Sequence, residues 1–227
     1  YFTGSKSHNI ELRQLSLDRG WTLNEYALTQ VDGGEVVAAA TEKDIYSALD
    51  LPWITPEVRE GAGEIKAARN GTLPRPLEVE DIRGDLHVHT TWSGDGRSSM
   101  ADMLDVAVAR GLSYVALTDH AEDLVMNGLS RGRVLEEREA IEAERTRRQE
   151  LHILHGAELN IGRDGSVDYD PDFLRTFDFT VASIHSHFDL DEAEQTRRML
   201  TAIVNPSVSV IGHPSGRKIG RRPGAQF

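Results

Sequence analysis

Residues 84–96 read GDLHVHTTWSGDG, and this stretch decides the fold class of the chain. It begins as a strand with His87 and His89 two positions apart, and Asp95 follows in a Ser-Gly-Asp-Gly sequence. Side chains at positions i and i+2 of a strand point to the same face, so both imidazoles can reach one ion. Asp95 either joins them as a ligand or only builds the turn. We therefore predict that this strand leads into a metal site.

Strand and helix patterns alternate from residue 81 onward. Short apolar strands are predicted at 84–89, 113–120, 151–161, 177–185 and 208–213, and helices at 100–111, 134–150 and 191–204. Such alternation implies a parallel sheet, either open or closed into a barrel. The charged segment Glu136–Glu150 is interpreted as a solvated helix face and not as an acidic site.

Each of the five predicted strands ends in a residue type that binds metals. After the first strand, these are Asp119 with His120, then Glu158, His185 and His213. The carboxyl ends of parallel strands form one rim, where sites of α/β proteins lie. Any one histidine is more often a satisfied core or surface residue, and the other four are assigned to that class: His8, His152, His155 and His187. The recurrence on five successive strands favours one joint site.

The residue types restrict the chemistry of that site. Imidazole and carboxylate ligands suit Zn, Mn or Fe. The chain has no cysteine, which excludes disulfides and cysteine-bound zinc. Two ions about 3.5–4 Å apart suit phosphoester hydrolysis. Arg217, just beyond His213, is predicted either to clamp a phosphate or to be an ordinary turn residue. Asp119 either orients a catalytic base, or only accepts a hydrogen bond from a backbone amide or orients an imidazole.

Composition sets the wider limits. The chain has 227 residues, 39% of them hydrophobic, which suggests one or two globular domains. No apolar run reaches the roughly 18 residues that indicate a membrane span. The net charge of −12 argues against electrostatic coating of nucleic acid, but it permits an enzyme that meets nucleic acid at a metal site. The chain begins without Met and stops at RRPGAQF, so we expect a piece of a longer protein.

Residues 1–50 have the pattern of a small α+β unit. We predict a helix around residues 10–15 that stops near Gly20, a strand over 23–30, and a turn at Asp32-Gly33 before a return strand over 35–40. Thr41 and Asp44 resemble a capping box at the start of another helix. Residues 51–80 contain four of the eight prolines and are interpreted as a linker.

The ordered set GDLHVHTTWSGDG, ALTDH, GAELNI, SIHSH and GHPSGR resembles the PHP (polymerase and histidinol phosphatase) domain. The N-terminal YFTGSKSHNIELRQLSLDRGWTLNEYAL is similar to the end of a family X DNA polymerase thumb, and the order of the two resembles bacterial family X polymerases with a C-terminal PHP domain. The resemblance implies a thumb segment at 1–50, a linker at 51–80 and a C-terminally truncated PHP domain at 81–227. The implied α/β fold is an incomplete distorted (β/α)7 barrel preceded by a small α+β segment.

The same resemblance implies up to three divalent ions, Mn²⁺ or Zn²⁺. His87 and His89 would hold one ion with Glu158, Glu158 would bridge to a second ion held by His185 and His213, and Asp95 and His120 would hold a third. Asp119 would orient a catalytic group. In the thumb, the implied nucleotide-binding residues are Tyr1, Phe2, Gly4, Ser5 and Asn9, although this segment could also be a plain helix entry.

The function implied is a manganese-dependent 3′–5′ exonuclease that acts on DNA 3′ ends in repair. A small-molecule phosphatase of the histidinol phosphatase kind is one alternative, and the thumb-like segment argues against it. A non-catalytic structural module of a polymerase is another, and the retained ligand types argue against that. We expect a cytoplasmic protein with no membrane contact, monomeric in the parent enzyme.

Overall fold

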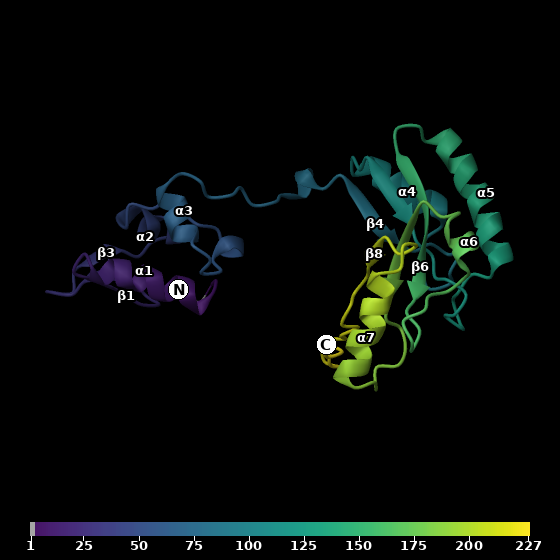
Figure 1. The fold of residues 1–227 in the computed structure, drawn as a ribbon. Coiled ribbons are helices and arrows are strands. Elements are labelled where there is room, and N and C mark those ends of the chain that lie inside the picture. Colours follow the sequence, from purple (N-terminus) through teal and green to yellow (C-terminus); the bar gives the residue numbers. More distant parts are fainter. Residues whose placement is uncertain (1–2) are drawn as a thin grey trace. The chain divides into compact units, whose positions relative to one another are not determined.

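The computed structural model describes residues 3–227 and divides the chain into two compact units, Tyr1–Asp81 and Ile82–Phe227 (Figure 1). Each unit has its own hydrophobic core. The predicted nucleotide-binding residues Tyr1 and Phe2 lie outside the described residues. No described helix is both long and apolar enough to cross a membrane.

The first unit is a three-stranded antiparallel sheet with helices. Its elements are α1 (Lys6–Leu17), β1 (Trp21–Leu23), β2 (Leu28–Gln30), β3 (Val36–Ala38), α2 (Glu42–Ala48), a 3-10 turn (Pro56–Val58) and α3 (Glu64–Arg69). The capping box of α2 is confirmed, because the Thr41 hydroxyl accepts from the Asp44 amide and the Asp44 carboxylate accepts from the Thr41 amide. Ser5 caps α1 by accepting from the amide of His8.

The strand predicted over residues 23–30 is wrong, because two strands and a turn occupy this segment. The Asn24 side-chain oxygen accepts from the amides of Tyr26 and Ala27 at 2.9 and 3.0 Å. Asparagine favours this local side-chain to backbone bond, which competes with strand pairing. The alternation of apolar residues across the turn therefore imitates one continuous strand.

Much of the segment interpreted as a linker packs into the first unit. Leu51, Ile54 and Ile65 are buried in its core, and α3 lies within the segment. Residues 72–78 form neither helix nor strand, and a short 3-10 turn follows at Val79–Asp81. The domain boundaries stay a prediction, and this packing favours a linker shorter than 51–80.

The second unit is a five-stranded parallel sheet in the order of the sequence. The strands are β4 (Gly84–Val88), β5 (Tyr114–Leu117), β6 (His152–Asn160), β7 (Phe179–Ser183) and β8 (Val210–Ile211). The connecting helices are α4 (Met100–Ala109), α5 (Arg131–Arg147), α6 (Pro171–Leu174) and α7 (Glu192–Ile203). The predicted fold class, an incomplete α/β barrel, is confirmed, and the parallel orientation of the strands brings all five carboxyl ends to one rim.

Helix α5 begins earlier than predicted, because Ser130 accepts from the amide of Arg133 and caps it. Its charged face is not fully solvated. Glu137 is only 1% exposed and faces the protein interior alongside Val134 and Ile141. The interpretation of Glu136–Glu150 as a solvated face is therefore wrong at Glu137 and also at Arg148, which is 7% exposed.

Candidate metal centre

The seven predicted metal ligands line one cavity of about 690 Å³ at the carboxyl ends of the strands. Each comes from the segment at or just after a strand. They are His87 and His89 from β4, Asp95 from the loop after it, His120 after β5, Glu158 on β6, His185 after β7 and His213 after β8. The expected convergence of these side chains is thus present in the structure.

Glu158 occupies the middle of this cluster and is 1% exposed. Its Oε2 lies 3.3 Å from His87 Nε2, 3.2 Å from His89 Nε2 and 3.0 Å from His120 Nδ1. Its Oε1 lies 3.1 Å from His185 Nε2 and 2.8 Å from His213 Nε2. One carboxylate therefore has five imidazoles around it.

Three groups of ligand atoms are close enough to share an ion. In each group the atoms lie within 4.8 Å of one another, and the groups are His87–His89–Glu158, His89–Asp95–His120 and His120–Glu158–His185. The Nε2 atoms of His87 and His89 face each other at 3.1 Å. Nδ1 of His89 is buried and lacks a hydrogen-bond partner among the described residues. Both nitrogens of His120, in contrast, lie within 3.1 Å of a carboxylate oxygen, Nδ1 close to Glu158 and Nε2 close to Asp95. This donor set of imidazoles and carboxylates fits Zn²⁺ or Mn²⁺.

The charge distribution favours cations in the cavity. Burial opposes ionisation of Glu158, but hydrogen bonds from His185, His213, His87 and His89 outweigh it, and the pKa of Glu158 is strongly lowered. Burial likewise disfavours the charged form of His89, yet the Glu158 and Asp95 carboxylates raise its pKa. For His120, burial dominates and lowers the pKa, which keeps the ring neutral and able to bind a metal.

A hydrogen-bonded support lies behind the cluster. His185 Nδ1 is 2.7 Å from Asn160 Oδ1, and the Asn160 side-chain amide donates to Asp168. The Asn160 backbone amide also donates to the Asp168 carboxylate. Because Asn160 presents its oxygen to Nδ1, His185 carries the proton there and turns Nε2 toward Glu158. Sequence reasoning missed Asn160, whose signal was its place on the Glu158 strand.

Asp119 lies outside the cavity and is 2% exposed. Its carboxylate accepts from the Thr90 amide at 2.8 Å and the Thr90 hydroxyl at 2.7 Å, and from the amide and hydroxyl of Ser93 at 3.3 and 2.6 Å. Ser93 Oγ also lies 2.8 Å from Asp95 Oδ1. These contacts fit the second of the two predicted roles, in which Asp119 holds backbone groups, here those of the loop that carries Asp95.

Cationic side chains form one side of the cavity. Arg217, the predicted phosphate clamp, lines it together with Lys218 and Arg222. The Arg222 guanidinium lies 3.5 Å from the centre of the Phe188 ring and donates to the Gly216 carbonyl, which fixes its position. Lys218 and Arg222 were missed, although the sequence KIGRR directly after Arg217 carries the signal.

The predicted nucleotide-binding residues of the first unit have local structural contacts. Gly4 has a φ of 86° and lies against Arg59, where a Cβ would come within 2.4 Å of the Arg59 Cβ. Ser5 caps α1, and Asn9 lines a small cavity of about 200 Å³ with Tyr46 and Arg59. Their nucleotide-binding role stays a prediction.

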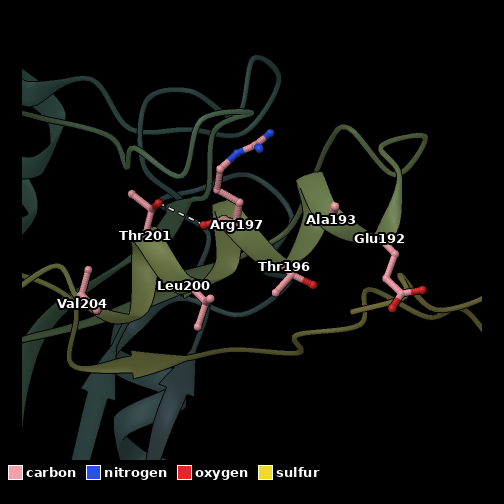
Figure 2. Close-up of a pocket in the computed structure, with 7 residues that line it drawn as sticks. All are labelled: Glu192, Ala193, Thr196, Arg197, Leu200, Thr201 and Val204. Carbon is pink, nitrogen blue, oxygen red and sulfur yellow. Dashed lines mark hydrogen bonds between the residues drawn. The ribbon is translucent and has the colours of Figure 1, made fainter.

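A second hollow, of about 700 Å³, runs along α7 (Figure 2). Its described lining mixes aliphatic and polar side chains: Glu192, Ala193, Thr196, Arg197, Leu200, Thr201 and Val204. None of the seven predicted metal ligands is among these lining residues. The carboxylate of Glu192 lies at one end of the helix and the aliphatic Val204 at the other. The chemistry that the sequence predicts therefore belongs to the strand-end cavity.

Comparisons with known proteins give the chain its relatives. A family model of the DNA polymerase beta thumb matches residues 1–60, and one of the PHP domain matches residues 85–215. The DNA polymerase/3′-5′ exonuclease PolX of Bacillus subtilis is 40% identical over an alignment of 228 positions, which covers 100% of this chain and 40% of that protein. A probable phosphatase of Thermoanaerobacter is 32% identical over 57% of this chain and 53% of its own length. The chain thus spans only about half or less of these relatives.

Among solved structures, the zinc, L-histidinol and phosphate complex of histidinol phosphate phosphatase from Lactococcus lactis aligns with a TM-score of 0.42 and 21% identity. The alignment covers 59% of this chain and 58% of that one. The PHP family model matches more than half of the residues, over the same strands that build the histidine cavity. The chain therefore belongs to the PHP domain family, with a segment of the polymerase beta thumb type ahead of the PHP domain.

Proposed function

We propose that this chain is a metal-dependent phosphodiesterase that removes nucleotides from DNA 3′ ends, as the 3′–5′ exonuclease module of a family X DNA polymerase. The observation that carries the proposal is the convergence of five imidazoles on the buried Glu158 carboxylate, beside the cationic side chains of Arg217 and Lys218. The name of the Bacillus subtilis relative, similar along this whole chain, supports the substrate.

The residues have separate tasks in this proposal. His87 and His89 would hold one ion with Glu158, Glu158 would share a second ion with His185 and His213, and Asp95 and His120 would hold a third. Bound Mn²⁺ or Zn²⁺ would supply a water of lowered pKa and neutralise charge on the phosphodiester. Arg217 and Lys218 would bind the phosphate oxygens, Arg217 through its fork of donors and Lys218 as a point charge.

The support around the cluster fixes these tasks in space. Asn160 sets the proton on Nδ1 of His185, so that Nε2 is free to bind an ion. Asp119 acts as a positioning residue, since it holds Thr90 and Ser93 in the loop that carries Asp95. We do not assign Asp119 a direct contact with the substrate, because its four hydrogen bonds occupy the carboxylate.

A phosphomonoesterase acting on a small molecule is the second candidate. Several probable phosphatases match the PHP part of the chain, for example at 32% identity over 138 residues. The match of residues 1–60 to a polymerase thumb favours DNA over a small molecule, because a thumb segment serves a nucleic-acid substrate. A non-catalytic structural role is disfavoured, since each of the five strand ends keeps a residue able to bind metal.

The test compares two substrates on the metal-depleted chain after addition of Mn²⁺ or Zn²⁺. One is a 5′-labelled oligodeoxynucleotide, and the other is p-nitrophenyl phosphate. We expect metal-dependent shortening of the oligonucleotide from its 3′ end, and its loss in Glu158→Gln. Glu139→Gln is the matched control, because Glu139 is an exposed carboxylate on α5. Hydrolysis of the monoester alone would favour the phosphatase, and equal activity of Glu158→Gln would contradict both candidates.

We extend the proposal to the setting of the enzyme: manganese as the physiological ion, a role in DNA repair, a cytoplasmic location and a monomeric parent. The polymerase and exonuclease name of the relative supports a role on DNA, and the lack of cysteine fits a cytoplasmic location. Growth of the parent strain under DNA damage, with and without His89→Ala, tests the repair role directly.

A further inference from the structure

The loop after β5 carries two apolar side chains that nothing covers. Val125 is 96% exposed and Met126 is 92% exposed, while Ala121 and Leu129 at the ends of the loop are buried. Water disfavours such exposure, so two adjacent bare apolar side chains beside a functional cavity indicate a contact with another molecule. We call residues 124–127 the apolar tip.

Backbone hydrogen bonds define the conformation of the loop that carries the apolar tip. Gly128 and Asn127 donate their amides to the Leu124 carbonyl at 2.7 and 3.1 Å, and Leu124 donates to the Ala121 carbonyl at 3.2 Å. The Asp123 amide donates to the Asp168 carboxylate at 2.7 Å. These hydrogen bonds define the backbone on both sides of Val125 and Met126, and Asp168 is the same residue that supports Asn160 behind His185.

A cleft of about 570 Å³ lies beside the apolar tip and adjoins the metal cavity. Leu124 and His185 line both the cleft and the cavity, so the two hollows meet at a predicted metal ligand. Apolar walls come from Leu124, Val125, Met126 and Ile161. Polar side chains come from Asp123, Asn127, Ser186 and His187. Asn160 also lines the cleft, but its side chain is engaged by His185 and Asp168.

We propose that this cleft binds the nucleobase of the 3′-terminal nucleotide while its phosphodiester lies at the metal centre. The inference rests on the proposed function and names the part of the substrate that the cleft would hold. A nucleobase has two apolar faces and a polar edge, which matches apolar walls with a few hydrogen-bonding groups. The cationic side chains Arg217 and Lys218 follow β8, so phosphates and base meet loops from different strands of the sheet.

Binding of one base in a side cleft has a consequence for selectivity. A paired and stacked terminal base cannot enter the cleft until it leaves the helix, and this costs less for a mismatched or unpaired base. The apolar tip would stack against the exposed base face and so favour the unstacked state, as apolar wedges do in other nucleic-acid complexes. The cleft would therefore make the enzyme prefer frayed and mispaired 3′ ends.

The test uses the double variant Val125→Ser/Met126→Ser, which leaves the buried residues of the unit unchanged. Its matched control is Leu77→Ser/Val79→Ser, because those two apolar side chains are 81% and 83% exposed and do not line the cavity or the cleft. Two readouts are needed. The first is release of a terminal nucleotide from matched and mismatched 3′ ends in Mn²⁺. The second is fluorescence of 2-aminopurine at the 3′ terminus, behind a hydrolysis-resistant phosphorothioate linkage.

We expect the chain to release mismatched ends faster than matched ones and to increase 2-aminopurine fluorescence by unstacking the base. The double variant should lose the fluorescence increase and release mismatched ends about fivefold more slowly or worse, since loss of two apolar side chains that a base would cover costs at least that factor. The control variant should stay within twofold of the original chain.

Two failures can be told apart. If the double variant keeps both the preference for mismatched ends and the fluorescence increase, the inference is overturned while the proposed function stands. If the original chain releases no nucleotide with any metal, the proposed function fails, and the fluorescence still decides whether the cleft binds a base. No fluorescence increase with the original chain overturns the inference as well.

Discussion

Each of the two units buries a glutamate against histidine, and the two arrangements differ in the number of histidines around the carboxylate. In the first unit, the fully buried His8 has one partner for each ring nitrogen: Nδ1 lies 2.5 Å from Glu64 Oε1, and Nε2 lies 2.8 Å from the Tyr46 hydroxyl. In the second unit, five imidazoles surround the single carboxylate of Glu158.

The difference separates a structural histidine from a candidate ligand. A ring whose two nitrogens both have hydrogen-bond partners has no lone pair left for an ion. Removal of that ring leaves a buried carboxylate unpaired, which lowers the free energy of unfolding. A carboxylate has about four lone-pair sites, so five imidazoles compete for it and some keep free nitrogens. The visible result is Nδ1 of His89, which is buried without a hydrogen bond among the described residues.

The largest expected effect separates the two histidine classes by activity. We expect His89→Ala to lower metal-dependent hydrolysis about 10³-fold, since an ion supplies several kcal/mol of transition-state stabilisation. His152→Ala is the matched control, because this histidine is exposed at the start of β6. A quantitative 3′-end assay in Mn²⁺ measures both, and more than a tenth of the original activity in His89→Ala would contradict the metal-site assignment.

The reverse experiment removes the satisfied histidine. His8→Ala should destabilise the first unit by about 3 kcal/mol, because it leaves Glu64 and Tyr46 without their buried partner. Urea unfolding followed by Trp21 and Trp53 in a Trp92→Phe background reports this unit alone. Manganese binding by the second unit should be unchanged. A variant as stable as the original chain would show that the His8–Glu64 pair contributes nothing net.

Metal binding should stabilise one unit and leave the other unchanged. A ligand at 100 times its dissociation constant stabilises the folded state by about 2.7 kcal/mol. We therefore expect Mn²⁺ to raise the unfolding temperature reported by Trp92, in the second unit, and not that reported by Trp21 and Trp53. Equal shifts for all three reporters would place the ion elsewhere. Addition of EDTA should reverse the effect.

The smallest expected effect concerns Glu137, a buried carboxyl group that is not surrounded by several histidines. Burial, with a further contribution from Asp119, raises the pKa of Glu137 to about 10. The folded state keeps this proton up to that pH, whereas the unfolded state releases it near its ordinary pKa of 4.5. The folded state thus binds one more proton between these values, and the free energy of unfolding falls as pH rises, by at most about 1.4 kcal/mol per pH unit.

Glu137→Gln removes this proton exchange while it keeps the shape of the side chain. We expect the variant to gain stability relative to the original chain as the pH rises from 6 to 9, in urea unfolding followed by Trp92. Glu136→Gln, at an exposed neighbouring carboxylate, should show no such trend. Parallel pH curves for Glu137→Gln and the original chain would show that Glu137 ionises in the folded state.

The sequence predicts which side chains converge on the strand-end cavity, because strand ends carry that information. His87, Glu158 and His213 lie far apart in the chain, but alternating strands and helices with short apolar strands require a parallel sheet, and a parallel sheet brings its carboxyl ends together. No detail of packing is needed for that step. The resemblance to the PHP domain adds the assignment of the seven residues to particular ions.

The sequence fails where a side chain chooses between two partners of similar chemistry. The local sequence Thr118-Asp119-His120 does not indicate which side chain enters the cavity. In the structure, Asp119 bonds to Thr90 and Ser93, and His120 lines the cavity. Asn24 breaks a predicted strand by bonding to its own backbone, and Glu137 lies buried on a helix that looks solvated. These outcomes depend on tertiary contacts that local patterns do not contain.

The order of the strands also has a kinetic consequence. Each strand of the second unit pairs with its neighbour in sequence, so the sheet can grow from one edge to the other. The chain closures are then shorter, and cost less entropy, than a non-sequential strand order would require. His213 follows the last strand and contacts Glu158 across 55 residues. The complete cluster can exist only after the final pairing forms, so an ion shared by Glu158 and His213 would act on the unfolding rate and lengthen the lifetime of the folded state.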